Sequence, residues 1–355
     1  MVPTPRDGSQ TMTPRVVLVT GVNGFLGAQL AMRLASDPDI ERVLCVDIVP
    51  PSPEVRRRLG RAEFIRADIR NRLIAKVIAA ARVDTVVHTS VSPEPVGGGR
   101  ALNKELNVIG TMQLLAACQT SPLVRRVVLK STSAVYGSSP RDPAVFTERT
   151  EPRELPSGGY AKDAAEIEGY LRGFARRRPD VVTTTLRFSN FLGPRADTVL
   201  SRYFALPAVP VPLGHDPRLQ LVHTEDAVAV TRLATLTDLP GVYNVAGEGV
   251  LTLTQAVRRA GRLPVVLPRP ALRPVGAVLR RVVPLGWPPE SGTPDFGQVM
   301  DTTSLRENAG FVPRWSTAQV FDDFVQGRGL RPLVDADRLG GGWDRIRSAT
   351  VPGRR

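Results

Sequence analysis

A tyrosine at the start of a helix-like segment is the residue of this sequence best placed to exchange a proton with a substrate. Tyr160 opens the stretch YAKDAAEIEGYLRGFARR, in which apolar residues recur at helical spacing. A free phenol titrates near ~10, so it is a poor base at neutral pH unless a nearby cation favours its ionised form. The residue one turn later is the uncharged Ala164, and Lys162 points roughly 200° away from Tyr160. Tyr160 is therefore either an acid/base group without a nearby cation on its helix or an aromatic residue at a helix start.

Three evenly spaced glycines follow the first strand-like run and predict a nucleotide site. The stretch VVLVTGVNGFLG leads from a strand into a helix-like segment. Such glycines permit a tight turn, close approach of a diphosphate to the backbone, and close packing of helix on strand. Asp47 closes the second strand, where its carboxylate can bind the ribose hydroxyls of NAD and repel the 2′-phosphate of NADP. The cofactor residues expected here are Gly21, Asn23, Gly24, Phe25, Leu26, Gly27 and Asp47.

Apolar, β-branched runs alternate with helix-like stretches through the first half of the chain. Strands are predicted at 15–20, 42–47, 63–68, 84–90, 125–131 and 181–188. Helices are predicted at 25–36, 100–119 and 160–177. This alternation is typical of a parallel sheet covered by helices on its faces. The fold class we expect is α/β, a Rossmann-type doubly wound parallel sheet with a smaller C-terminal α/β substrate domain.

The pattern changes after about residue 190 into shorter elements, which suggests a second functional region. We expect a disordered N-terminus at 1–14, an NAD-binding Rossmann domain at 15–190, a substrate-binding region at 191–331 that is partly interleaved with the sheet, and a mobile basic tail at 332–355. The segment 263–289 carries arginines and no acidic residue. It is predicted to be either a proline-broken helical cover or a weak peripheral membrane contact.

Composition excludes several other classes of protein. The net charge of +13 comes almost entirely from dispersed arginines, without aromatic interleaving or a groove-reading helix, so nucleic acid is not an expected partner. Cys45 and Cys118 lie in apolar segments and are predicted to be reduced core residues. The three histidines are scattered, so no metal site is expected. Without a secretory signal or a long apolar run, the expected location is cytoplasmic.

Further motifs follow the glycines in a fixed order, and the whole set carries a resemblance. These motifs are ADIR at 67–70, VVHTS at 86–90, NVIGT at 107–111, KSTSAVYG at 130–137, LRFSNFLGP at 186–194 and LVHTEDAV at 221–228. With the spacing Gly-x-x-Gly-x-x-Gly, they resemble the extended short-chain dehydrogenase/reductase family, which includes NAD-dependent sugar-nucleotide epimerases and dehydratases. The resemblance covers roughly residues 14 to 330. It implies NAD as cofactor, a nucleotide sugar as substrate, and a homodimer.

The resemblance also assigns roles near the cofactor. It implies that Asp68 and Ile69 contact adenine, that His88 belongs to the segment lining the cofactor, and that Asn107 supports the active site. The implied catalytic pair is Thr132, whose hydroxyl orients the substrate oxygen, and Tyr160, which acts as the base. The family carries a lysine one turn after that tyrosine, but this chain carries Ala164.

Substrate contacts are predicted from both the resemblance and residue chemistry. Asn190 matches the asparagine that touches the substrate diphosphate, and Ser133 flanks Thr132. Arg187, Arg202 and Arg218 could grip a diphosphate through bidentate hydrogen bonds, although a solvated arginine is the alternative for each. His223 could either touch the substrate phosphates or cap the following helix.

Three functions remain open at this level. The first is a UDP-hexose 4-epimerase-type enzyme whose chemistry is impaired or altered by Ala164. The second is a non-catalytic NAD-binding sensor or assembly protein, which would need no tuned tyrosine. The third is an NAD-dependent dehydrogenase of a hydroxysteroid or isoprenoid alcohol, with segment 263–289 covering an apolar substrate. Specificity in such a fold lies in the variable second region, so the motifs do not choose the substrate.

Overall fold

The computed structural model defines most of the chain. It describes residues 13–92, 99–137, 139, 141–152, 159–268, 270–271, 275 and 297–333. The predicted mobile ends, 1–14 and 332–355, lie almost wholly outside the described residues, as does most of segment 269–289.

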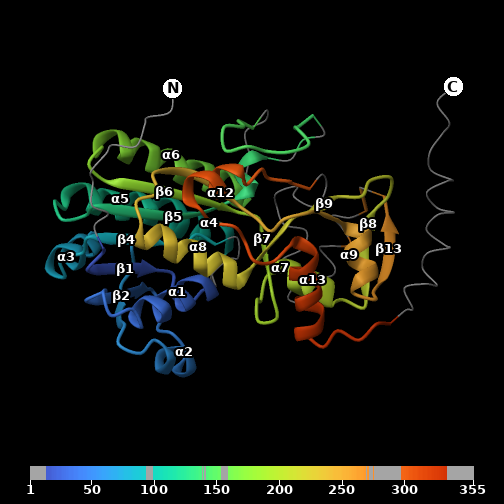
Figure 1. Cartoon of the computed structure of the whole chain (residues 1–355), viewed down its shortest axis with the longest axis horizontal. Helices are drawn as coiled ribbons and strands as arrows, with labels where there is room; N and C mark the ends of the chain where they lie inside the picture. Colours follow the sequence, from blue (N-terminus) through green and yellow to red (C-terminus); the bar gives the residue numbers. More distant parts are fainter. Residues whose placement is uncertain are drawn as a thin grey trace.

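A seven-stranded sheet, parallel throughout, forms the centre of the larger part of the molecule (Figure 1). The strand order is β11-β6-β5-β4-β1-β2-β3. The strands are β1 (Val16–Thr20), β2 (Arg42–Asp47), β3 (Glu63–Arg66), β4 (Thr85–His88), β5 (Arg126–Thr132), β6 (Val182–Phe188) and β11 (Gly241–Val245). The six predicted strands are confirmed. The seventh, β11, comes from the second half of the chain, so that half returns to complete the sheet.

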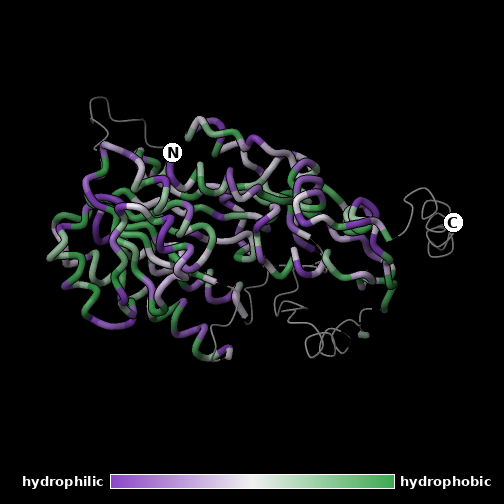
Figure 2. Tube along the Cα trace, turned by 90° about the horizontal axis from the view of Figure 1, so that it is seen from below, coloured by the Kyte–Doolittle hydropathy of each residue, from purple (hydrophilic) through white to green (hydrophobic). Residues whose placement is uncertain are grey.

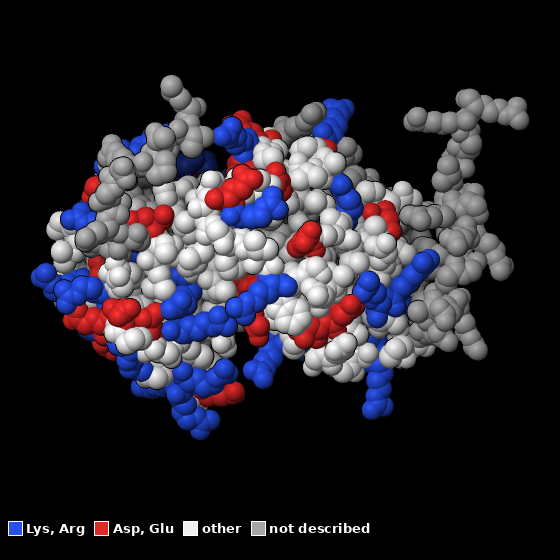
Figure 3. Space-filling view, viewed as in Figure 1, with Lys and Arg blue, Asp and Glu red and all other residues white. Residues whose placement is uncertain are grey.

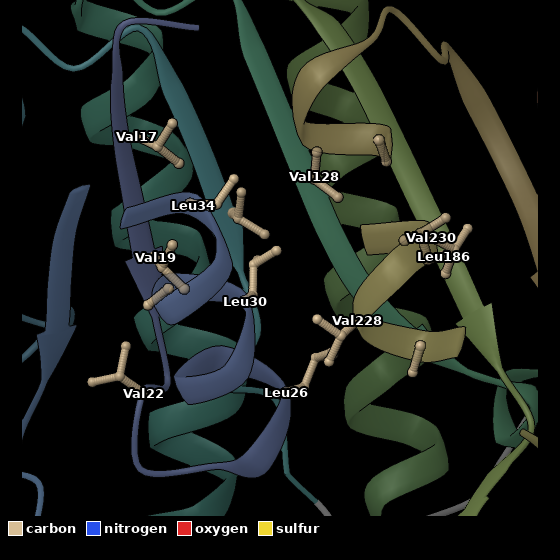
Figure 4. Close-up of a cluster of buried hydrophobic side chains, with 14 of the residues drawn as sticks. Val17, Val19, Val22, Leu26, Leu30, Leu34, Val128, Leu186, Val228 and Val230 are labelled. Carbon is tan, nitrogen blue, oxygen red and sulfur yellow. The ribbon is translucent and has the colours of Figure 1, made fainter. Parts of the chain in front are cut away.

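Helices cover both faces of the sheet, as a doubly wound fold requires. On one face, α1 (Phe25–Ala35) and α8 (Thr224–Leu236) pack on residues such as Val17, Val19 and Val128 (Figure 4). On the other face, α3 (Leu73–Ala80), α5 (Gly110–Thr120) and α6 (Gly159–Arg177) pack on the alternate strand positions. Successive side chains of a strand point to opposite faces, so each strand contributes to two cores. Figure 2 shows the hydrophobic segments running through this interior.

The connection predicted as a single helix at 100–119 is three segments. It comprises α4 (Gly99–Lys104), a π-helical turn η1 (Glu105–Ile109) and α5. A π-helical turn inside a longer helix is uncommon and occurs frequently at functional sites. Short elements elsewhere in the first half are α2 (Pro53–Arg58) and the 3₁₀ turn η2 (Ser133–Tyr136), which directly follows β5.

A smaller group of elements lies beyond one end of the sheet, on the right of Figure 1. Its strand pairs are β7 (Asn190–Leu192) with β10 (Leu221–His223), β9 (Arg218–Leu219) with β12 (Leu251–Thr252), and β8 (Ala208–Pro212) with β13 (Leu263–Leu267). The helices α7 (Val199–Ala205), α9 (Leu253–Arg259) and α13 (Thr317–Gly327) enclose their own core with these strands. The remaining helix, α12 (Thr303–Ala309), packs near β11. Because β13 is a strand, the helical cover predicted from residue 263 is wrong for its first five residues.

Several compositional expectations can be compared with the described residues. Cys45 and Cys118 are free and buried, and burial raises the pKa of each thiol to about 12, so both are unreactive core residues. Within the described ranges, no helix is long and apolar enough to cross a bilayer, and no group of three potential ligands could hold a metal. Figure 3 shows basic and acidic side chains interspersed over one face of the described chain.

Candidate functional site

The loop between β1 and α1 is shaped by its glycines. Gly21 has a φ of +75°, and a Cβ there would lie 2.5 Å from Cα of Ser90. A Cβ on Gly27 would overlap the carbonyl oxygen of Gly21 and the hydroxyl of Thr89, so the helix packs tightly on the strand. Gly24 differs, because its Cβ would meet only the Gly21 oxygen at 3.4 Å. The loop therefore leaves an open backbone surface at Gly24 and at the N-terminus of α1, which suits an anionic diphosphate.

Asp47 holds the other side of this loop. Its carboxylate accepts hydrogen bonds from the backbone N–H of Asn23 at 3.1 Å and of Ile48 at 2.8 Å. The Asn23 side chain donates to the carbonyl of Val49 at 2.6 Å, which ties the glycine loop to the end of β2. The Asp47 side chain is only half-buried, so its oxygens can also accept hydrogen bonds from a ligand. The loop and the carboxylate together fit a dinucleotide.

The remaining residues of the predicted adenine side lie beside this loop. Asp68 is half-buried and forms an ion pair with Arg70 at 2.6 Å, and that guanidinium lowers the pKa of the carboxyl. Ile69 is buried against Gly110, where a Cβ would lie 2.8 Å from the Ile69 side chain. Leu26 is buried in the core beneath the loop. The backbone after β3 is thus fixed closely against α5.

His88 and Asn107 position the segment that follows β4. The His88 ring is enclosed between the hydroxyls of Thr20 at 2.8 Å and Thr111 at 2.7 Å, and burial lowers its pKa to about 3. Asn107, on the π-helical turn, accepts from Ser92 N at 3.2 Å and donates to Ser92 O at 2.9 Å. Both side chains make internal hydrogen bonds, so they can affect a ligand only by positioning the backbone that follows β4.

The residues of the KSTSAVYG motif turn at the end of β5. Thr132 caps η2 by accepting a hydrogen bond from Ala134 N at 3.2 Å. Ser133 is buried behind it. Ser131 points to the opposite face, where its hydroxyl donates to Glu168 of α6 at 2.5 Å. Of the three hydroxyls, Thr132 is the half-exposed one at the carboxyl end of the sheet, where ligands bind in this architecture.

Tyr160 lies in the first turn of α6, close to the Thr132 side chain. Burial raises the pKa of its phenol well above the ordinary value of 10, the interaction with Thr132 lowers it, and the negative charge of Asp163 raises it further. Asp163 is fully buried and receives two hydrogen bonds of 2.7 Å from the guanidinium of Arg100. The structure thus brings Tyr160 and Thr132 together but makes the phenol a weaker acid.

Position 164 has no room for a charged side chain. Ala164 is 1% exposed and belongs to an apolar cluster with Val135, Tyr136, Phe146, Ala246 and Met300. Lys162 is exposed on another side of α6. Neither residue of this helix therefore offers a cation to the Tyr160 phenol.

Sequence reasoning did not single out Lys130, the residue two positions before Thr132. Its ammonium donates to the carbonyl of Val91 at 2.6 Å and lies 5.7 Å from the centre of the Phe191 ring. Burial lowers its pKa to about 8. The available signal was a lysine within an otherwise apolar strand, immediately before a polar motif.

The predicted substrate residues are dispersed around the smaller group of elements. Asn190 is exposed on β7, and Arg218 is half-buried on β9. Arg202 forms an ion pair with Asp197 at 2.8 Å. His223 accepts a hydrogen bond from Glu225 N at 3.2 Å, which is the capping contact, and its other ring nitrogen lies 3.1 Å from Asp323.

Arg187 is not available to grip a diphosphate. It is buried, and its guanidinium binds both carboxylate oxygens of Glu168, at 3.0 and 2.6 Å. It also donates to the hydroxyl of Tyr136 at 2.9 Å. Tyr136 is 1% exposed and donates to Asn244 at 2.6 Å, so it serves packing and this network.

Comparison with known proteins gives one family and a consistent set of folds. Residues 17–246 match the model of the NAD dependent epimerase/dehydratase family. An uncharacterised protein of Mycobacterium tuberculosis (strain H37Rv) is 50% identical over 328 residues, covering 92% of this chain and 87% of the relative. The UDP-glucose 4-epimerase of Thermotoga maritima, solved with UDP-glucose, superposes with a TM-score of 0.67 at 21% identity, covering 88% and 98% of the two chains. The dTDP-glucose 4,6-dehydratase of Bacillus anthracis, solved with NAD, gives 0.68 at 18% identity, covering 94% and 99%.

Proposed function

Because the chain belongs to the NAD-dependent epimerase/dehydratase family, we propose that it oxidises and re-reduces a sugar nucleotide, as an enzyme of the UDP-hexose 4-epimerase type. NAD is the cofactor of this family. The observation that carries the proposal is the glycine loop, whose backbone is open at Gly24 and closed at Gly21 and Gly27. A loop of that shape at the carboxyl end of β1 is built to receive a dinucleotide diphosphate.

The residues around the loop would select and hold the cofactor. The Asp47 carboxylate, already fixed by two backbone N–H groups, would accept hydrogen bonds from the adenosine ribose hydroxyls. A 2′-phosphate at that place would meet like charge, which favours NAD over NADP. When bound, NAD supplies a reversible acceptor for a hydride from the substrate carbon.

Thr132 and Tyr160 would hold the reacting oxygen of the sugar. Their side chains lie close together at the carboxyl end of β5, so one substrate hydroxyl can contact both. Asn190 and Arg218 lie on the smaller group of elements, and we propose that they contact the substrate diphosphate. Substrate specificity would then depend on the elements after residue 190.

The proposal is tested by incubating the purified protein with UDP-glucose, UDP-galactose, UDP-glucuronic acid and dTDP-glucose. Interconversion of one sugar nucleotide, or loss of water from it, is expected, and anion-exchange chromatography with mass spectrometry detects either product. Gly24→Leu tests whether turnover depends on the glycine loop. Its side chain fills the open face of the loop and should abolish both NAD retention and turnover. Absence of any product with the whole panel, in protein shown to contain NAD, would overturn the proposed activity.

A second candidate function is favoured by the environment of Tyr160. The apolar cluster at Ala164 and the raised pKa of the phenol suit a protein that binds NAD without catalysis. Calorimetry with NAD and NADH separates the two candidates when combined with the turnover assay. Tight binding without product from any sugar nucleotide favours a sensor or assembly protein, whereas product formation rejects that role.

A further inference from the structure

The proton-transfer group of this site is the least explained part of the proposed reaction. Oxidising an alcohol requires a group that takes the hydroxyl proton, and the best base has a pKa near the working pH. The Tyr160 phenol is far from that range, because burial and the charge of Asp163 both raise its pKa. Helix α6 offers no cation to correct this, since Ala164 is enclosed by apolar groups and Lys162 faces solvent.

Lys130 lies on the same side of β5 as Thr132. Strand residues two apart point to one face, and their Cα atoms are about 6.5 Å apart. The Thr132 side chain in turn lies close to Tyr160. A lysine side chain is long and flexible, so the Lys130 amine can reach an oxygen held at Thr132. Lys130 and Thr132 therefore point to one side of β5, and Tyr160 approaches Thr132 from α6 at the carboxyl end of the strand.

The Lys130 amine also lies beside the cofactor loop. Its acceptor, the carbonyl of Val91, follows β4, which is adjacent to β5 in the sheet. The Phe191 ring beneath it packs edge-on against Phe25, the first residue of α1, with ring centres 5.1 Å apart. These contacts place the Lys130 amine at the carboxyl edge of the sheet, where a dinucleotide and its substrate would meet.

Lys130 has no ionic partner within the described ranges. Its contacts there are a neutral carbonyl and an aromatic ring, and no carboxylate forms an ion pair with it. His88 is the titratable group whose own pKa responds to Lys130, and it is neutral because burial lowers its pKa to about 3. A half-buried amine without a counter-ion is easily deprotonated, and burial lowers the pKa of Lys130 to about 8.

Magnitudes favour the amine over the phenol as the base. At pH 7 a group with a pKa of about 8 is deprotonated in about one molecule in ten. A phenol of ordinary pKa would be ionised in about one in a thousand at that pH, and the Tyr160 phenol is a weaker acid than that. Enzymes that use lysine as a general base lower its pKa to this range by burial.

We propose that Lys130 is the catalytic acid/base of this site, taking the proton from a substrate hydroxyl that Thr132 and Tyr160 hold. The inference rests on the proposed function. In the oxidative direction the substrate O–H bond breaks and its proton forms an N–H bond on the Lys130 amine, which becomes ammonium. Bound NAD would accept the electron pair of the breaking C–H bond as hydride and be reduced, and the carbon would be oxidised to a carbonyl. The reverse step returns the hydride to the carbon and the proton to the oxygen.

Four variants of the NAD-loaded protein test the assignment in the turnover assay. Lys130→Met removes the amine. Lys130→Arg keeps the charge, but arginine stays protonated at the pH of the assay and cannot accept a proton. Both are expected to lower kcat at least 100-fold, whereas Lys162→Met, on the exposed side of α6, keeps the parental rate. Tyr160→Phe removes one hydrogen bond to the substrate and is expected to cost only about tenfold.

A readout independent of turnover follows the proton directly. The chain has four lysines, at 76, 104, 130 and 162, so nitrogen NMR of lysine-labelled protein can assign each amine by substitution. Lys130 is expected to titrate near 8. In the parent enzyme, kcat for the oxidative step should rise with pH through the same value, because the neutral amine is the active form.

The outcomes distinguish the possible failures. Normal kcat in Lys130→Met, or full activity in Lys130→Arg, overturns the acid/base assignment while leaving the proposed function intact. The same holds if Tyr160→Phe abolishes turnover and Lys130→Met does not, or if Lys130 titrates above pH 10. If the parent enzyme turns over no sugar nucleotide, the proposed function fails and this inference fails with it.

Discussion

The two ends of the candidate site are held in place by different means. The cofactor loop relies on the backbone, because a glycine at φ +75° and two close approaches determine its shape. The end around Thr132 and Tyr160 relies on buried polar side chains from distant segments, including Ser131, Glu168 and Arg187. A backbone loop of this kind requires glycine at specific positions, whereas its other positions can vary more freely. At the Thr132 end, the lysine lies on β5, two residues before Thr132, while α6 carries the uncharged Ala164 one turn after Tyr160.

The largest effect is expected at Glu168, which anchors α6 to β5 and β6. Replacing it by alanine leaves the buried Arg187 guanidinium unpaired, and breaking a buried ion pair in this way costs about 3–5 kcal/mol. Urea unfolding of Glu168→Ala measures the loss. The matched control in the cofactor half is Glu63→Ala, since Glu63 pairs with Arg42 at the surface at 2.8 Å and such pairs contribute about 0–1 kcal/mol.

The double variant Glu168→Leu/Arg187→Met sharpens the same test. It replaces both charges by apolar groups of similar size, and such exchanges are often neutral for stability. Recovery of most of the free energy of unfolding would show that the single variant suffers from an unpaired charge. Equal loss in the single and double variants would instead mean that the Glu168 network holds α6 through Ser131 and not through its charge.

The sequence predicts best those features that depend on residues close together in the chain. The glycine loop, the six early strands and the α6 helix are local patterns, and the structure confirms those elements. The sequence does not predict strand β11, because its place in the sheet depends on pairing with β6, 57 residues earlier, as between Val242 and Thr185. At the site, the sequence predicts that Arg187 binds a diphosphate or faces solvent, because it does not show that Arg187 is buried in an ion pair with Glu168.

The proton chemistry illustrates the same limit. The sequence shows that Ala164 lacks a charge, but not that an apolar cluster closes the space around it. The sequence shows a lysine at position 130, but its lowered pKa arises from burial near β4 and β7, and residue spacing does not predict that burial. Local patterns therefore locate the cofactor end, whereas the catalytic end needs the three-dimensional structure.

A smaller effect is expected within the glycine loop, where two substitutions of the same size should differ. Gly21→Ala strains a positive φ and pushes a methyl group against the Ser90 backbone, so we expect a loss of about 2–4 kcal/mol in the free energy of unfolding. Gly24→Ala meets only an oxygen at 3.4 Å and should change stability by less than about 1 kcal/mol. Its effect should appear instead as a roughly tenfold weaker affinity for NAD, measured by calorimetry. Equal stability of the two variants would contradict the view that the backbone conformation of Gly21 determines the shape of the loop.

The smallest effect tests His88, which joins β1, β4 and α5 and so lies between the two ends. Its folded pKa is about 3, against 6.5 for the free group, because the ring is buried between Thr20 and Thr111. Between those values the unfolded chain binds a proton that the folded chain does not, so stability rises with pH and is lost as the pH falls. The expected loss from this group is about 2 kcal/mol between pH 7 and pH 5.

Urea unfolding at pH 7 and pH 5 measures that loss, and His88→Gln is the variant that isolates it. Glutamine cannot take up a proton, so the variant begins less stable at pH 7 if its amide replaces the ring hydrogen bonds imperfectly, but it should lose little more on acidification. Two parallel pH profiles for parent and variant would mean that carboxylates, not His88, set the acid sensitivity. A steeper profile in the parent alone would mean that the contact between the cofactor loop and the catalytic end depends on a neutral imidazole, and that mild acid weakens both ends together.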